Sequence, residues 1–100
     1  MKLRLVLYGL KDCIYCQWLK GALQKMEIEY EYKEADEKDD RRIASLTGEA
    51  AYPFLEVHLN DTIHYITPSE EYYGESKRVH VFSKVQDALE LLLNILQKYK

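Results

Sequence analysis

The chain has 100 residues and a mass of 11.9 kDa, which fits a single domain spanning residues 1–100. A hydrophobic content of 47% and a charged content of 31% are typical of a globular protein and exclude a low-complexity one. The net charge of −3 argues against nucleic-acid binding, because proteins that bind phosphates are usually basic. No apolar run approaches the roughly 20 residues of a spanning helix, so we expect no membrane insertion.

Two cysteines, Cys13 and Cys16, are too few for the disulfide framework of a secreted chain this short. The N-terminal apolar stretch is interrupted by Arg4 and ends in a turn, which makes it a poor signal peptide. We therefore expect a cytoplasmic protein in a reducing compartment, where a close cysteine pair is functional rather than structural.

The first third of the chain predicts a strand, a helix and a second strand. Residues 2–8 begin with alternation and become continuously apolar, which is typical of a central strand. After a turn at residues 9–12, apolar residues recur at helical spacing from Cys13 onward. Gly21 weakens this helix by about 1 kcal/mol relative to alanine, which suits close backbone packing. Residues 28–33 alternate strictly and complete a right-handed βαβ unit.

The rest of the chain predicts a helix, a hairpin and a last helix. Residues 34–40 carry five carboxylates and lead into the acidic first turn of a helix that ends near Gly48. Residues 53–59 and 62–67 predict two strands, and the short turn between them makes the pair an antiparallel hairpin. A final amphipathic helix runs toward Lys98.

This order, βαβ-α-ββ-α, predicts an α/β sandwich with a four-stranded mixed sheet and helices on both faces. Residues 68–77 are polar and predict a loop. Residues 78–82 alternate and have the pattern of a short extra strand, which the four-stranded prediction leaves out.

A Cys-x-x-Cys motif, Cys13 to Cys16, lies where the first strand gives way to the first helix. Unpaired N–H groups and the helix dipole stabilise a thiolate there, so we expect the pKa of Cys13 to fall below the value of about 8.5 of a free thiol. Cys16 lies one turn further along roughly the same face and can close a disulfide. Cys13 is therefore the expected nucleophile and Cys16 the expected resolving thiol. Lys11 adds positive charge nearby, and Asp12 opposes it.

Zinc sites use the same cysteine spacing but normally need four ligands. The other candidates are the histidines His58, His64 and His80, of which the first two flank the predicted hairpin turn. A single histidine on a strand is more often a surface or hydrogen-bonded residue. The position of the cysteines between strand and helix favours a redox dithiol, and we predict no metal.

Tyr52-Pro53 stands at the head of a predicted strand, where proline is tolerated. An X-Pro bond adopts the cis form at a cost of only about 0.5–1 kcal/mol. A cis bond would turn the backbone of Tyr52 outward, where an extended peptide or glutathione could pair with it. An ordinary trans proline opening an edge strand is the alternative.

The chain resembles the glutaredoxin branch of the thioredoxin-like superfamily over about its first two thirds. The resemblance is carried by the strand at residues 28–33 and by four short motifs: Tyr8-Gly9, Cys13-Ile14-Tyr15-Cys16, Thr47-Gly48 and Tyr52-Pro53. It implies a thioredoxin-like, glutaredoxin-type three-layer fold and a dithiol mechanism with Cys13 as nucleophile and Cys16 as resolving thiol. It also implies that Tyr15 forms a lip of the site and that Tyr52 and Pro53 face the substrate.

The chain departs from the glutaredoxin pattern in three places. Ile14 replaces the proline of the motif, and Tyr52 replaces the small β-branched residue before the cis-proline. The Gly-Gly-x-Asp segment that holds glutathione is absent after Thr67, where an insertion spans residues 68–82 and carries acidic residues. These acids would repel an anion, so glutathione is a disfavoured reductant and we expect no bound cofactor.

We predict a monomeric thiol-disulfide oxidoreductase that reduces protein or small-molecule disulfides, with a disulfide-containing protein or glutathione as its partner. Lys11, Tyr15, Tyr52 and Pro53 are the predicted substrate-binding residues. One alternative is a non-catalytic thioredoxin-fold module that binds a protein through Tyr52 and Tyr72-Tyr73. Another is a zinc or iron–sulfur site shared between two chains through Cys13.

Overall fold

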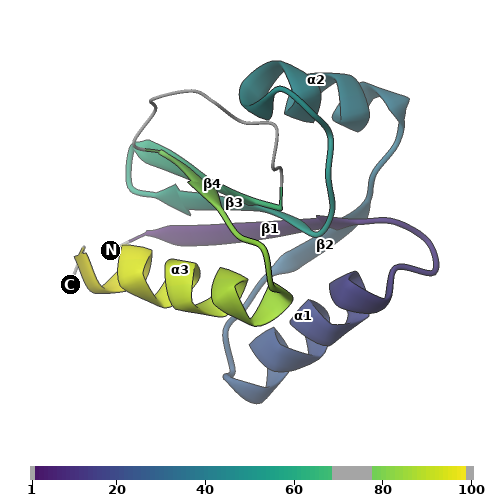
Figure 1. Cartoon of the computed structure of the whole chain (residues 1–100). Coiled ribbons are helices and arrows are strands. Elements are labelled where there is room, and N and C mark those ends of the chain that lie inside the picture. The colour runs from purple at the N-terminus through teal and green to yellow at the C-terminus, as the bar shows by residue number, and fades with distance from the viewer. Residues whose placement is uncertain (1, 69–77, 99–100) are drawn as a thin grey trace.

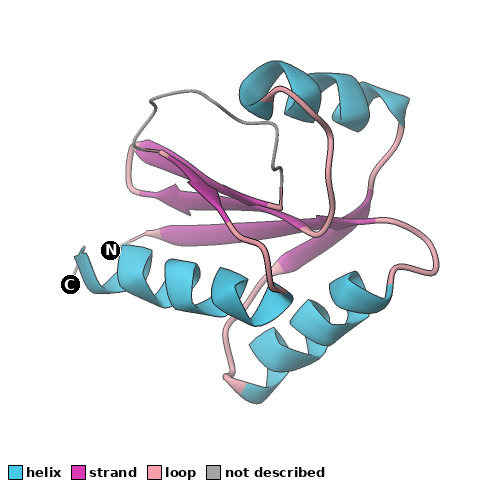
Figure 2. Ribbon diagram, viewed as in Figure 1, coloured by secondary structure: helices cyan, strands magenta, loops and turns pink. Residues whose placement is uncertain are grey.

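The computed structural model describes residues 2–68 and 78–98. Its elements are, in chain order, β1 (Leu3–Gly9), α1 (Ile14–Lys25), β2 (Glu31–Glu34), α2 (Glu37–Thr47), β3 (Phe54–Leu59), β4 (Thr62–Thr67), β5 (Val79–Val81) and α3 (Val85–Lys98). Figure 1 and Figure 2 show α2 on one face of the sheet and both α1 and α3 on the other. This arrangement confirms the predicted α/β class with helices on both faces. No helix in the described ranges is both long and apolar enough to cross a membrane.

The sheet is mixed, as predicted, but it has five strands rather than four, in the order β2-β1-β3-β4-β5. The interior strand β1 runs parallel to β2 and antiparallel to β3, which is the middle strand of the sheet. β3 and β4 form the predicted antiparallel hairpin. The fifth strand forms because residues 79–81 run parallel to β4, with the amide of Tyr65 donating to Arg78 and that of Phe82 donating to Thr67. The four-stranded prediction is therefore wrong.

Of two local predictions near the β2–α2 connection, the start of β2 is wrong and the acidic start of α2 is confirmed. β2 starts at Glu31 instead of residue 28, since its ladder with β1 begins only at the pair of Val6 and Glu31. The acidic start of α2 is confirmed: Asp36 is the N-cap, and it exchanges hydrogen bonds of 2.9 and 3.0 Å with Asp39. Gly48 ends the helix at a φ of 90°, a conformation that glycine adopts without strain.

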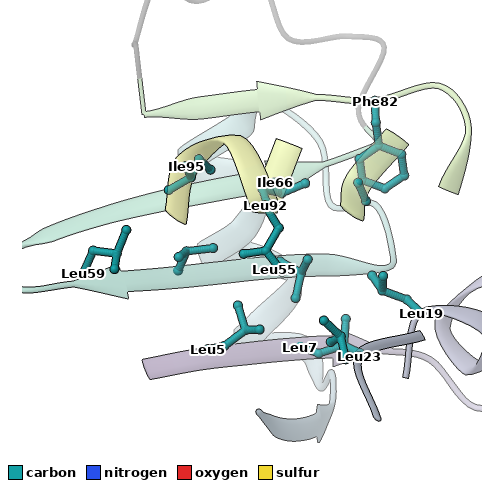
Figure 3. Close-up of a cluster of buried hydrophobic side chains, with 12 residues drawn as sticks. Leu5, Leu7, Leu19, Leu23, Leu55, Leu59, Ile66, Phe82, Leu92 and Ile95 are labelled. Atoms are coloured by element: carbon teal, nitrogen blue, oxygen red, sulfur yellow. The ribbon is translucent and has the colours of Figure 1, made fainter. Parts of the chain in front are cut away.

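The larger hydrophobic core lies between the sheet and the helix pair α1 and α3 (Figure 3). Leu5 and Leu7 of β1 point to this side, together with alternate residues of β3. Its fully buried leucines include Leu7, Leu19, Leu23, Leu55, Leu59 and Leu92. This packing holds the end of β1 against the first turns of α1, which is where the cysteine motif lies.

The opposite face carries a smaller core of Val6, Tyr8, Ile43 and Phe54 under α2, edged by polar groups. There Arg42 donates 2.6 Å to the buried carboxylate of Glu56 and 2.9 Å to the hydroxyl of Tyr8. That hydroxyl in turn donates 3.2 Å to Glu56. Burial and the neighbouring carboxylate raise the pKa of Tyr8. The network ties α2 to β1 and β3 through satisfied charges.

Two histidines meet between β4 and β5, where Nδ1 of His64 lies 3.2 Å from Nε2 of His80. Burial, followed by the charges of Arg78 and Lys98, lowers the pKa of His64. Burial, the neighbouring imidazole and Lys98 likewise lower the pKa of His80. Both pKa values are lowered because a proton on either ring would add charge to a partly or fully buried and already positive environment.

This pair makes the stability of the fold depend on pH. Both imidazoles titrate near 6.5 in the unfolded chain but only at lower pH in the folded chain. The contribution of the two histidines to the free energy of unfolding is therefore complete above pH 6.5. It is lost as the pH falls through the pKa values that they have in the folded chain. Urea unfolding followed from about pH 7.5 to about pH 5 should show this decline, and it should be smaller in the double variant His64→Gln/His80→Gln. An equally steep decline in the double variant would contradict the expectation; His58→Gln is the matched control.

Candidate functional site

The cysteine motif follows β1, where the chain leaves the strand at Gly9 and turns into α1. The amide of Cys13 donates 3.3 Å to the carbonyl of Leu10, which closes the turn. Asp12 occupies the left-handed region at a φ of 63°, where aspartate is among the better tolerated residues. Cys13 itself is extended and is the N-cap residue of α1. The turn thus delivers a sulfur to the position where helices usually place an oxygen.

A disulfide joins Cys13 to Cys16, with 5.2 Å between their Cα atoms. The backbone N–H of Cys16 donates 3.1 Å to Sγ of Cys13, so this sulfur satisfies one of the free amides of the helix start. The first turn of α1 contains no acidic residue. Negative charge on Cys13 would therefore meet an amide donor and the positive end of the helix dipole.

The two cysteines differ in their exposure to solvent. Cys16 is fully buried, whereas Cys13 is half-buried. The residues between them project outward, with Ile14 exposed by 79% and Tyr15 by 63%. An external reagent can therefore reach Cys13, while Cys16 lies behind it, on the side of the core.

Gly9 allows the close packing that positions Cys16. A Cβ atom added at Gly9 would lie 2.6 Å from the hydroxyl of Tyr32 and 3.1 Å from the Cβ atom of Cys16. Real Cβ contacts are essentially never as short as 2.6 Å, so any side chain at this position would displace Tyr32, and the 3.1 Å contact would also press on Cys16. In the sequence, Gly9 indicates only a turn, because the approach of Tyr32 depends on the pairing of β2 with β1.

A cavity of about 500 Å³ lies beside the motif. Tyr15 comes to it from the motif, and Tyr52 and Pro53 come from the start of β3, joined by a cis peptide bond. The rest of its wall comes from the residue that follows β4, from the segment between β5 and α3, and from the first residues of α3: Pro68, Phe82, Ser83, Lys84, Val85 and Gln86. Three of the four predicted substrate-binding residues are thus brought together.

The fourth predicted substrate-binding residue, Lys11, is exposed and does not line the cavity. Sequence patterns do not indicate that Phe82 and Lys84 line the cavity, because their position depends on the pairing of β5, which has only a weak strand signal. Tyr72 and Tyr73, predicted to serve a partner surface, lie outside the described residues.

The ring of Tyr52 is anchored by its hydroxyl, which donates a hydrogen bond to the carboxylate of Asp40 on α2. Burial, that hydrogen bond and the negative charges of α2 raise the pKa of Tyr52 far above its usual value. The cavity wall therefore carries a neutral phenol fixed to α2. The Asp40 partner is a second contact that no local sequence signal indicates.

The histidines do not complete a zinc site with the cysteines. His58 faces α2 with Glu56, to which it comes within 3.8 Å, whereas His64 faces α3 and meets His80. The two rings point to opposite faces of the sheet, so His58 and His64 cannot share a metal ion across the hairpin, the alternative that the sequence pattern disfavours. Within residues 2–68 and 78–98, no three histidine, cysteine or acidic side chains gather closely enough to hold a metal.

A larger cavity, of about 610 Å³, lies at the other end of β1 and β2. Leu3, Ile28 and Tyr30 are among its lining residues, and neither cysteine borders it. Neither cysteine lines the smaller cavity either, but Tyr15 of the motif does, so the smaller cavity is the one that adjoins the cysteine motif.

The difference in access predicts selective alkylation of the reduced protein. We expect iodoacetamide to modify Cys13 at least about tenfold faster than Cys16, because only the first sulfur is both accessible and stabilised as a thiolate. Peptide mass spectrometry after short reaction times would measure both rates. In urea the two rates should converge, and equal rates in the folded protein would contradict the expectation.

Comparison with known proteins leaves the family of the chain open. No protein-family model, no curated protein and no solved structure matches it. The resemblance of its motifs to those of glutaredoxins therefore remains a prediction. The function has to be inferred from the dithiol, the cavity beside it and the elements that hold them.

Proposed function

We propose that the chain is a thiol-disulfide oxidoreductase with a thioredoxin-like fold of the glutaredoxin type, acting through Cys13 and Cys16. The observation that carries the proposal is the N-cap position of the accessible Cys13 sulfur, which accepts the N–H of Cys16. The buried sulfur of Cys16 lies within bonding reach of it. This is the arrangement that a nucleophilic thiol and its resolving partner require.

In the proposed reaction, the thiolate of Cys13 attacks one sulfur of a substrate disulfide. The substrate S–S bond breaks, one substrate sulfur leaves as a thiolate that takes a proton from solvent, and a mixed disulfide remains on Cys13. Deprotonated Cys16 then attacks the Cys13 sulfur and releases the second substrate thiol. Two electrons have passed to the substrate, and the chain is left with the Cys13–Cys16 disulfide. An external thiol or dithiol reductant restores the reduced pair.

The cavity of about 500 Å³ offers a binding place for the chain that flanks a substrate disulfide. Pro53, Phe82 and Val85 give it apolar walls, and the start of α3 adds amide donors. Tyr15 belongs both to the wall of this cavity and to the motif, two residues from Cys13, so a substrate held there contacts the motif. The arrangement suits a peptide or a small-molecule disulfide, which are the predicted substrate classes.

Single-turnover kinetics test the proposal without a physiological reductant. Prereduced wild type should release thiol from a chromogenic aromatic disulfide, and Cys13→Ser should be slower by at least about 100-fold. Cys16→Ser should accumulate a mixed disulfide, visible as an added mass on Cys13, because the resolving step is lost. Reduction by Cys13→Ser at the wild-type rate would refute the proposal. The double variant Cys13→Ser/Cys16→Ser is the blank.

Thiol titration separates a catalytic dithiol from a non-catalytic binding module of the same fold. The amide of Cys16 and the dipole of α1 should lower the pKa of Cys13 below the value of about 8.5 of a free thiol. Thiolate absorbance measured against pH in Cys16→Ala would give this pKa directly. A titration at the free-thiol value would contradict catalysis and favour the binding module, and Cys13→Ala provides the reference for Cys16.

A further inference from the structure

The outer side of α1 carries a mostly apolar groove of about 320 Å³ that no described segment of the chain covers. We call it the α1 groove and define it by its lining: Gln17, Trp18, Gly21, Ala22 and Lys25. Trp18 is 43% exposed in it, an unusual position for the residue type with the largest apolar surface. Ile14, one turn earlier and next to Cys13, is also largely exposed. The apolar surface therefore runs from the dithiol along the helix.

Gly21 forms the floor of the α1 groove and has no role in packing within the described chain. A glycine inside a helix costs about 1 kcal/mol relative to alanine, which predicts close packing of another backbone. Yet a Cβ atom added at Gly21 would meet no atom within 4 Å. The space over Gly21 is therefore open to the backbone of another molecule.

The charge of α1 indicates which partner fits. Over its 12 residues the helix has two lysines and no acidic residue, although the whole chain has a net charge of −3. Lys25 lines the groove at one end, and exposed Lys11 precedes the helix at the other. Exposed Asp12 and Glu27 flank the helix. The three lysines Lys11, Lys20 and Lys25 therefore face two acidic residues and leave one positive charge in excess. This surface attracts an acidic segment and repels both a basic one and a second copy of α1.

We propose that the α1 groove docks an acidic amphipathic helix of the disulfide-bearing protein that Cys13 reduces; the inference rests on the proposed function. The apolar side of that helix covers Trp18 and crosses closest to α1 at Gly21. Its carboxylates face Lys25 and Lys11. The 12 residues of α1 span about 18 Å, so a partner helix of similar length reaches from the groove to the dithiol.

Binding can be measured apart from redox chemistry in the double variant Cys13→Ser/Cys16→Ser. The probes are two synthetic helical peptides with the same leucine stripe, one flanked by glutamates and the other by lysines. Trp18 is the chain's only tryptophan, so its emission reports occupancy of the groove. The glutamate peptide should shift this emission to shorter wavelength and bind at least about tenfold more tightly, with the difference shrinking in high salt. Equal affinities for the two peptides would overturn the proposal.

Two substitutions test the floor and the charge of the groove in the same assay. Gly21→Gln fills the floor while improving helix propensity, so the variant should fold at least as stably and bind the glutamate peptide about tenfold more weakly. Lys25→Glu should reverse the preference between the peptides. Lys38→Glu, an equal change of charge at an exposed position on α2, is the control and should alter nothing. Unchanged binding in both groove variants would overturn the proposal.

Kinetics with the same peptides carrying a terminal disulfide separate this proposal from the proposed function. Gly21→Gln should raise the KM for the glutamate-peptide disulfide about tenfold and leave reduction of the small aromatic disulfide unchanged. If wild type reduces neither substrate while the glutamate peptide still binds, the proposed function fails alone. If wild type reduces both and Gly21→Gln changes neither, docking fails alone. Self-association of wild type that Gly21→Gln abolishes would assign the groove to a second copy and overturn the proposal.

Discussion

The hydrogen bond from the backbone of Cys16 to the sulfur of Cys13 is the interaction on which the site depends. It puts a thiol in the place of the usual N-cap oxygen, so the same contact that starts α1 also prepares a nucleophile. Folding and reactivity are thereby coupled, because the amide becomes available only when the helix has formed. The reduced site should consequently be most nucleophilic in the fully folded chain.

The sheet supports this hydrogen bond because its strands pack against the buried side of α1. β1 is an interior strand that pairs on both sides, and its last residue, Gly9, has no side chain where Tyr32 and Cys16 come close. The buried leucines under α1 and α3 fix the helix from below, and the network of Arg42 and Glu56 fixes the strands on the other face. The accessible sulfur thus belongs to a rigid junction with the cavity of Tyr52 next to it.

Periodic segments and the cysteine motif could be predicted from the sequence, whereas contacts between distant segments could not. The helical spacing after Cys13 and the hairpin at residues 53–67 are long, regular patterns, and both elements are present. The predicted sheet lacks β5 because a strand of three residues gives a weak pattern and its partner, β4, lies on the other side of an insertion. The meeting of His64 with His80 follows from that pairing, so no local signal could show it. The same holds for the α3 side of the cavity.

The two outermost strands bear on how the molecule behaves when concentrated. Exposed backbone edges can template pairing with other chains, and native proteins limit this with short or charged strands. β2 is four residues long and three of them are charged, with Glu31 bonded to Arg4 at its start. β5, on the far edge, has only three residues. Neither edge strand offers a neighbouring molecule a long, uncharged backbone edge for hydrogen bonding. Edge-to-edge aggregation is therefore disfavoured, even though the side chain of Trp18 is exposed to solvent.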